Sequence, residues 1–196
     1  MKKSKNHEGD FNFPKMSKYL DSYVYLSKDR HIFLNEDVTK DTSSIVSALL
    51  LHYDNKDPSK DIFIYINSNG GDASALTNMY DVIQFISAPV STVCMGKAYS
   101  AGAVLLAAGA KGKRYAYKHS SIMIHGIQCA FPILSENDGP GARNYYEFLS
   151  SHNDTIMQIL ADHTGHSLEK VKKDCTRDYF MGAEEAVRYG LIDQVL

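Results

Sequence analysis

Short apolar runs alternate along the chain with longer segments whose apolar residues recur at helical spacing. The run from Ile62 to Ile66 is rich in β-branched and aromatic residues, which predicts a strand covered on both faces. The segment from Leu76 to Ile83 carries apolar residues on one helical face, which predicts an amphipathic helix. By these criteria we expect strands at residues 32–34, 62–66, 90–95, 115–117 and 122–124, and helices at 42–52, near 76–83, at 101–110 and at 142–163.

Residues with strong capping or turn preferences predict where these elements begin and end. Thr42 is the expected N-cap of the first helix, and Pro89 is expected to end the second. From Phe180 onward we expect a helix, ended by Gly190, and then a terminal strand. Strands that alternate with helices of this length are typical of βαβ crossovers with parallel pairing, so the pattern predicts an α/β fold.

Composition narrows the class of protein. The 196 residues suffice for one domain with a full core, and the net charge of −2 gives no electrostatic reason to expect nucleic acid or an anionic membrane as a partner. The first 18 residues are polar and lysine-rich without a following apolar stretch, so we expect a flexible arm at 1–18, a single domain at 19–196 and no secretory signal. Three widely spaced cysteines favour a reducing, cytoplasmic location.

The strongest candidate for chemistry is the stretch Ala98-Tyr99-Ser100-Ala101-Gly102. A predicted strand enters it and a predicted helix leaves it, and small residues allow a tight bend that exposes the hydroxyl, as in a nucleophile elbow. The N–H groups at the start of a helix would also favour negative charge developing beside Ser100. A small serine chosen for close helix–strand packing would explain the same pattern.

A second candidate is Asn69-Gly70-Gly71, which follows the strand predicted at 62–66. Paired glycines can turn backbone N–H groups toward a ligand or an oxyanion, although a tight strand-to-helix turn explains them as well. The chain has no GxxxxGK[ST] motif, so no nucleotide phosphate loop is expected.

His125 and Asp178 are the candidate partners of Ser100. His125 follows the strand predicted at 122–124, and a carboxylate such as Asp178 could orient its imidazole. A structural histidine and a surface or N-cap aspartate are the alternatives, and the spacing does not favour Asp178 over Asp174. The residues alone therefore indicate a possible serine hydrolase, and the histidine and cysteine spacings match no closed zinc site.

Several longer stretches resemble the proteolytic subunit of the Clp protease, the ClpP family. The resemblance covers about residues 18–196, and its motifs occur in the family's order. The matching stretches are Asp61–Gly71, Val90–Ala103, Ala108–Arg114, Met123–His125, Arg177–Met181 and Glu184–Asp193.

The resemblance implies a ClpP/crotonase-like α/β fold of repeated β-β-α units, with a protruding handle helix in the region of about 126–163. It implies a cofactor-free serine endopeptidase in which Ser100 is the nucleophile, His125 the general base and Asp178 the group that orients it. The N–H groups of Gly71 and Ala101 would form the oxyanion hole.

The resemblance also implies an assembly. Related subunits form two stacked heptameric rings, a tetradecamer, and an AAA+ Clp ATPase unfolds protein substrates and feeds them into the chamber. Phe63 and Tyr65 match aromatic positions where the ATPase docks. No nucleic acid or membrane partner is implied.

Some residues depart from the family's usual pattern. Asn69 stands in place of a proline, Asp72 follows the oxyanion glycine, and Tyr99 precedes the nucleophile. The stretch from Gly126 to Pro132 also differs, and Thr176 replaces an acidic residue. A carboxylate of Asp72 pointed at the oxyanion would oppose it, whereas one pointed away would be harmless.

Three hypotheses follow. The first is an active serine endopeptidase subunit. The second is a weakly active or inactive ClpP-like ring subunit that serves as a structural partner in a mixed assembly. The third is an acyl-CoA enzyme of the crotonase type, which shares the fold and an oxyanion hole.

Overall fold

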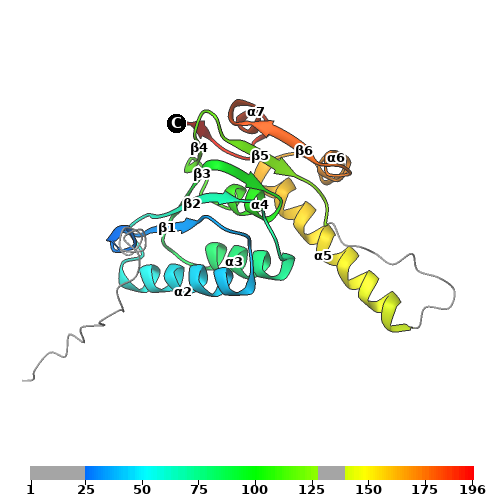
Figure 1. The fold of residues 1–196 in the computed structure, drawn as a ribbon, viewed down its shortest axis with the longest axis horizontal. Helices are drawn as coiled ribbons and strands as arrows, with labels where there is room; N and C mark the ends of the chain where they lie inside the picture. The colour runs from blue at the N-terminus through cyan, green and yellow to red at the C-terminus, as the bar shows by residue number, and fades with distance from the viewer. Residues whose placement is uncertain (1–24, 128–139) are drawn as a thin grey trace, which may run out of the picture.

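The computed structural model describes residues 25–127 and 140–196 and has a mixed α/β fold (Figure 1). The arm predicted at 1–18 and part of the predicted handle region lie outside the described residues. The elements are β1 (His31–Leu34), α2 (Lys40–Lys56), β2 (Ile62–Ser68), α3 (Ala73–Phe85), β3 (Val90–Tyr99), α4 (Ala101–Ala107), β4 (Arg114–Ala116), β5 (Ser121–Ile124), α5 (Pro140–Thr164), α6 (Leu168–Asp174), β6 (Tyr179–Gly182), α7 (Ala183–Tyr189) and β7 (Gln194–Val195).

The sheet is mostly parallel, as predicted. Its main path is β1-β2-β3-β4-β7, and every pair along it is parallel. The long strand β3 pairs with β4 through its first half and with β5 through its last three residues. β6 pairs with β5 in the antiparallel direction, which the sequence pattern does not predict. Among the described residues, α5 and α6 lie between these two strands in the chain.

The structure corrects two predicted boundaries. The N-cap of α2 is Thr39 rather than Thr42, because the two threonines form a capping box in which each side chain accepts the other's backbone N–H. Phe180 does not begin a helix: residues 179–182 pair as β6, and α7 starts only at Ala183. Gly190 ends α7 with φ 86°, as predicted. The short α6 has a single buried side chain, Val171, so it leaves no periodic signal.

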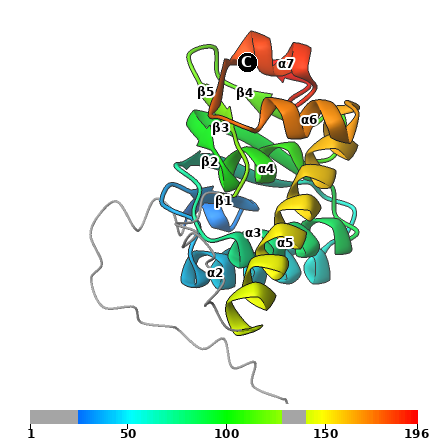
Figure 2. The same cartoon turned by 90° about the vertical axis from the view of Figure 1, so that its right-hand side faces the viewer.

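The core lies between the sheet and the helices that cover it. Figure 2 shows α2 and α3 beside each other below the β1–β2 edge. Ile62, Ile64 and Ile66 are buried in this core, whereas Phe63 and Tyr65 on the other face of β2 are only partly buried. The prediction that this strand is covered on both faces is therefore wrong for the single chain, in which only one face of β2 is fully buried.

The helix predicted at 142–163 is confirmed as α5. Its N-terminal half extends away from the body of the molecule in Figure 1. Ile156, Met157 and Leu160 in its C-terminal half are buried, while Tyr145 and Phe148 in the projecting half are exposed. In the part of the chain that the structure describes, no helix is both long and apolar enough to cross a bilayer.

Cys94 and Cys175 are both buried and both free of disulfide bonds. Burial raises the pKa of the Cys94 thiol to about 11 and that of the Cys175 thiol to about 12. Both thiols are therefore protonated at neutral pH and shielded from solvent. Cys129 lies outside the described residues.

Candidate active site

Ser100 lies on a strained bend between β3 and α4. Its backbone has φ 52° and ψ −120°, a conformation that residues other than glycine rarely adopt. The Ser100 N–H donates to the Met123 carbonyl of β5 at 2.8 Å, which fixes the bend against the neighbouring strand. The serine side chain makes no capping hydrogen bond to α4. This strand–bend–helix geometry is that of a nucleophile elbow, as predicted from the small residues around Ser100.

Gly70 allows the loop after β2 to pack directly on this bend. A side-chain carbon at position 70 would lie 2.7 Å from the Ser100 Cβ and 2.6 Å from the Tyr99 carbonyl oxygen. Gly70 also has φ 94°, which L side chains disfavour. The glycine pair thus does more than turn the chain, because Gly70 sets how closely the two loops approach.

Gly71 is held in place by hydrogen bonds of its neighbours. The Val38 N–H donates to the Gly70 carbonyl, and the Asp72 N–H donates to the Val38 carbonyl, both at 2.7 Å. The N–H of Gly71 makes no hydrogen bond within residues 25–127 and 140–196, so it can donate one to a bound group. The carboxylate of Asp72 accepts the Ala75 N–H at 2.7 Å and caps α3. The Asp72 carboxylate therefore interacts with the N-terminus of α3, the helix that it caps.

A cavity of about 560 Å³ brings the predicted site residues together. Ser100, His125, Gly71 and Ala101 all line it. Its remaining lining is mainly apolar and includes Leu76, Val104 and Ile156. Such a cavity can receive an apolar side chain while polar groups converge at one end, as in many substrate sites.

His125 and Asp178 form a pair at the edge of this cavity. The distance from His125 Nδ1 to Asp178 Oδ1 is 3.4 Å. The His125 side chain is 12% exposed and that of Asp178 is 44% exposed. Among the described residues, the buried Nδ1 atom has no hydrogen bond of acceptable geometry. The two side chains are therefore in contact but do not form a hydrogen bond.

Asp174, the alternative aspartate, is engaged elsewhere. Its carboxylate accepts hydrogen bonds from Lys170 Nζ at 2.7 Å and from the Tyr189 hydroxyl at 2.8 Å. Burial alone would raise the pKa of Asp174, but these two hydrogen bonds hold it below its usual value. The structure thus separates two aspartates that the sequence spacing does not distinguish.

Tyr99, beside the nucleophile, belongs to an aromatic rim. Its ring packs edge-to-face on Phe180 with 5.5 Å between centroids, and Lys97 Nζ lies 5.9 Å from the Tyr99 ring centroid. Phe180 is exposed and follows Asp178 closely in the chain. Sequence reasoning missed this contact because it depends on the pairing of Met123 with both Tyr99 and Phe180.

Phe63 and Tyr65 lie away from the cavity, on the outer face of β2. Phe63 stacks on His31 with 5.1 Å between ring centroids, and Tyr65 stacks on Phe33 at 5.0 Å. The parallel register of β1 and β2 causes this pairing, since His31 lies opposite Phe63 and Phe33 opposite Tyr65. The four rings form a partly exposed aromatic patch.

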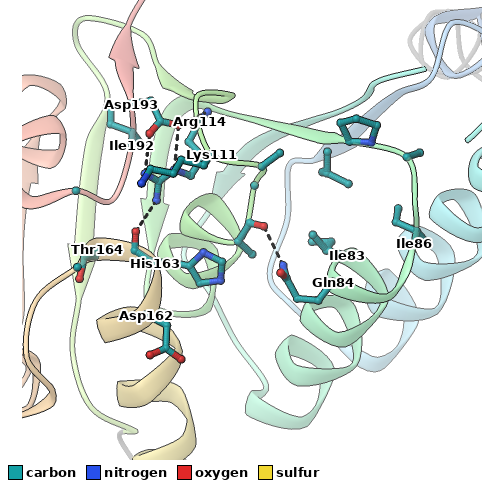
Figure 3. Close-up of a pocket in the computed structure, with 18 of the residues that line it drawn as sticks. Ile83, Gln84, Ile86, Lys111, Arg114, Asp162, His163, Thr164, Ile192 and Asp193 are labelled. Atoms are coloured by element: carbon teal, nitrogen blue, oxygen red, sulfur yellow. Dashed lines mark hydrogen bonds and ion pairs between the residues drawn. The ribbon is translucent and has the colours of Figure 1, made fainter. Parts of the chain in front are cut away.

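A larger cavity of about 810 Å³ lies elsewhere and is shown in Figure 3. Arg114 crosses it, donating two hydrogen bonds to the Asp193 carboxylate and one to the His163 carbonyl. Arg114 is 5% exposed, and its charge is compensated by Asp193. The arrangement ties β4, α5 and the C-terminal segment together and has no Ser100 or His125 in its lining.

Comparison with known proteins shows the family to which the chain belongs. The family model described as Clp protease matches residues 14–196. The ATP-dependent Clp protease proteolytic subunit 1 of Gloeobacter violaceus is 44% identical over 180 residues, which cover 92% of this chain and 89% of that protein. The α/β fold described above is the one expected for such a relative. The chain therefore belongs to the Clp protease family and is a serine-type peptidase.

Proposed function

We propose that the chain is the endopeptidase subunit of an ATP-dependent Clp-type protease, with Ser100, His125 and Asp178 as its catalytic triad. The observation that carries this proposal is the convergence of Ser100, His125, Gly71 and Ala101 on one cavity, with Asp178 paired to His125. The relative from Gloeobacter violaceus bears the name of a proteolytic subunit, which supports the same assignment.

The proposed reaction is peptide-bond hydrolysis through an acyl-enzyme. The Ser100 hydroxyl attacks the peptide carbonyl carbon while His125 takes its proton, and Asp178 stabilises the imidazolium that forms. The N–H groups of Gly71 and Ala101 donate to the tetrahedral oxyanion. His125 then gives its proton to the leaving amine, and water releases the acyl group by the reverse sequence.

Assembly and partner are part of the same proposal. The exposed Tyr145 and Phe148 on the projecting half of α5 are suited to contact a second ring, and the proposed assembly is two stacked heptamers. The aromatic patch that contains Phe63 and Tyr65 is the proposed docking surface for an AAA+ Clp ATPase. We place the assembly in the cytoplasm, in keeping with the free thiols of Cys94 and Cys175.

One observation favours a second function, that of a weakly active ring subunit in a mixed assembly. His125 Nδ1 makes no hydrogen bond to Asp178, and Asp178 is partly exposed. Catalytic hydrogen bonds are often long in unliganded enzymes and tighten only with substrate, so the contact does not by itself rule out the endopeptidase function. The acyl-CoA hypothesis draws no support from membership in a peptidase family.

Covalent labelling with a fluorophosphonate distinguishes the two functions. The purified protein and the Ser100→Ala variant are treated in parallel and read by intact mass. One label per chain that is lost in Ser100→Ala supports the triad. Absence of labelling, persisting after addition of a Clp ATPase and of a second proteolytic subunit, would favour the structural subunit.

A further inference from the structure

The backbone that follows the proposed general base is bordered by cavities on both sides. His125, Gly126 and Ile127 line the 560 Å³ cavity that contains Ser100, and the same three residues line a 330 Å³ cavity on the side of α5. The Ile127 side chain is partly buried and packs against the core. With a cavity on each side of the segment, backbone hydrogen bonds add to this packing in fixing its position.

Two such bonds hold the segment. The Gly126 N–H donates to the Cys175 carbonyl at 2.9 Å, and the Ile127 N–H donates to Asn153 Oδ1 at 2.8 Å. The first acceptor is a main-chain group in the loop that carries Asp178. The second is a side chain of α5, so only this bond depends on the identity of an amino acid.

The Asn153 amide also fits closely against Gly126. A side-chain carbon at position 126 would lie 3.1 Å from Asn153 Oδ1, tighter than nearly all contacts of that kind. At Nδ1 the imidazole of His125 has the 3.4 Å contact with Asp178 but no hydrogen bond within the described ranges. The position of its backbone therefore helps to set the direction of its ring. Asn153 holds that backbone two residues away.

We propose that Asn153 is a positioning residue, which holds the Ile127 peptide from α5 and thereby directs His125 toward Ser100. This inference rests on the proposed function, in which His125 activates Ser100. Asn153 does not contact the reacting atoms, and its effect passes through the 125–127 backbone. A misplaced base slows the attack by Ser100 and leaves the apolar cavity for substrate intact.

The test compares Asn153→Leu, which removes the acceptor at nearly constant size, with Asn153→Asp, which keeps an oxygen in the same place. Peptide hydrolysis and the rate of fluorophosphonate labelling are measured on the assembled protein. For Asn153→Leu we expect both kcat and the labelling rate to fall about tenfold, the size expected for one lost hydrogen bond, with KM changed less than about twofold. Asn153→Asp is expected to stay within about threefold of wild type.

Thr155→Val is the matched control on the same helix. Thr155 is exposed, and its hydroxyl donates to the Ser151 carbonyl one turn earlier. This variant is expected to keep wild-type kcat and labelling rate. Equal losses in Thr155→Val and Asn153→Leu would overturn the proposal, because the effect would then belong to α5 in general.

A wild-type kcat in Asn153→Leu would also overturn the proposal, as would equal losses of kcat in Asn153→Leu and Asn153→Asp.

If Asn153→Leu does not fold, kcat of Gly126→Ala is measured in the wild-type and Asn153→Ala backgrounds. If Gly126→Ala lowers kcat about threefold or more in the wild-type background but not in the Asn153→Ala background, the proposal is supported. If Gly126→Ala lowers kcat equally in both backgrounds, the proposal is overturned. If wild type itself is never labelled, the proposed function fails together with this inference, whereas a labelled wild type with an unaffected Asn153→Leu defeats the inference alone.

Discussion

His125 lies opposite Asp178 because of the register of two short antiparallel strands. β5 and β6 pair Ile124 with Tyr179, and His125 and Asp178 are the next residues outward on each side. Their side chains meet at 3.4 Å where the ladder ends. Strand pairing thus determines which aspartate can reach the histidine, and Asp174 is excluded by its own hydrogen bonds to Lys170 and Tyr189.

Replacing Asp178 with Asn is expected to lower kcat by about two to four orders of magnitude, because the amide can stabilise neither the required tautomer of His125 nor its imidazolium. Peptide hydrolysis at saturating substrate measures this. Asp174→Asn is the matched control and is expected to lower stability with little effect on kcat. If Asp174→Asn abolished activity and Asp178→Asn did not, the assignment of the triad would be wrong.

Gly70→Ala is expected to lower both stability and the rate of labelling at Ser100. The backbone conformation alone costs about 1–2 kcal/mol for a residue with a side chain, and the added carbon would displace Ser100. Denaturant unfolding and fluorophosphonate labelling measure the two effects. Gly141→Ala is the control, since Gly141 lies in the first turn of α5 with open space around it, and it is expected to leave stability and the labelling rate close to those of wild type.

The Arg114–Asp193 pair predicts a specific loss of stability in acid. Burial would raise the pKa of Asp193, but its hydrogen bonds from Arg114 and Gly112 hold that pKa below the usual 3.8. A carboxylate whose pKa is lower in the folded state stabilises the fold at higher pH, and this contribution is lost as the pH falls from about 4 through the lowered pKa.

Asp193→Asn is therefore expected to cost about 3 kcal/mol at neutral pH, because it leaves the buried Arg114 charge uncompensated. The difference from wild type should shrink below pH 4, where wild type loses the same interaction. Unfolding free energies measured across pH 2–7 provide the check, and a difference that stays constant to the lowest pH would contradict the role given to this pair.

The aromatic patch predicts a variant that separates two activities. Phe63→Ser combined with Tyr65→Ser removes two of the four rings of this patch. Aromatic side chains contribute much of the binding energy of protein interfaces, so their loss should weaken docking. Degradation of a folded protein with a Clp ATPase is expected to fall at least tenfold, while hydrolysis of a short peptide remains within about twofold. Loss of both activities would instead indicate a role for these rings in folding or assembly.

Local patterns in the sequence predict much of the fold and the place of Ser100. The strands, the amphipathic helices and the bend at Ser100 depend on neighbouring residues, so periodicity and small residues are sufficient to find them. The choice of Asp178 over Asp174 depends on the pairing of β5 with β6, and the hydrogen bond from Ile127 to Asn153 depends on how α5 packs. No local pattern encodes those contacts, and whether Ser100, His125 and Asp178 perform catalysis stays a prediction.

The buried thiol of Cys175 can report how often the region beside the proposed catalytic residues opens. Its carbonyl holds Gly126, and its sulfur is shielded with a pKa raised to about 12. An alkylating reagent can therefore react with it only when this region opens, so the alkylation rate counts opening events. Peptide mapping by mass would report that rate separately from Cys94 and Cys129, and would reveal whether a bound peptide or a neighbouring subunit keeps the loop closed.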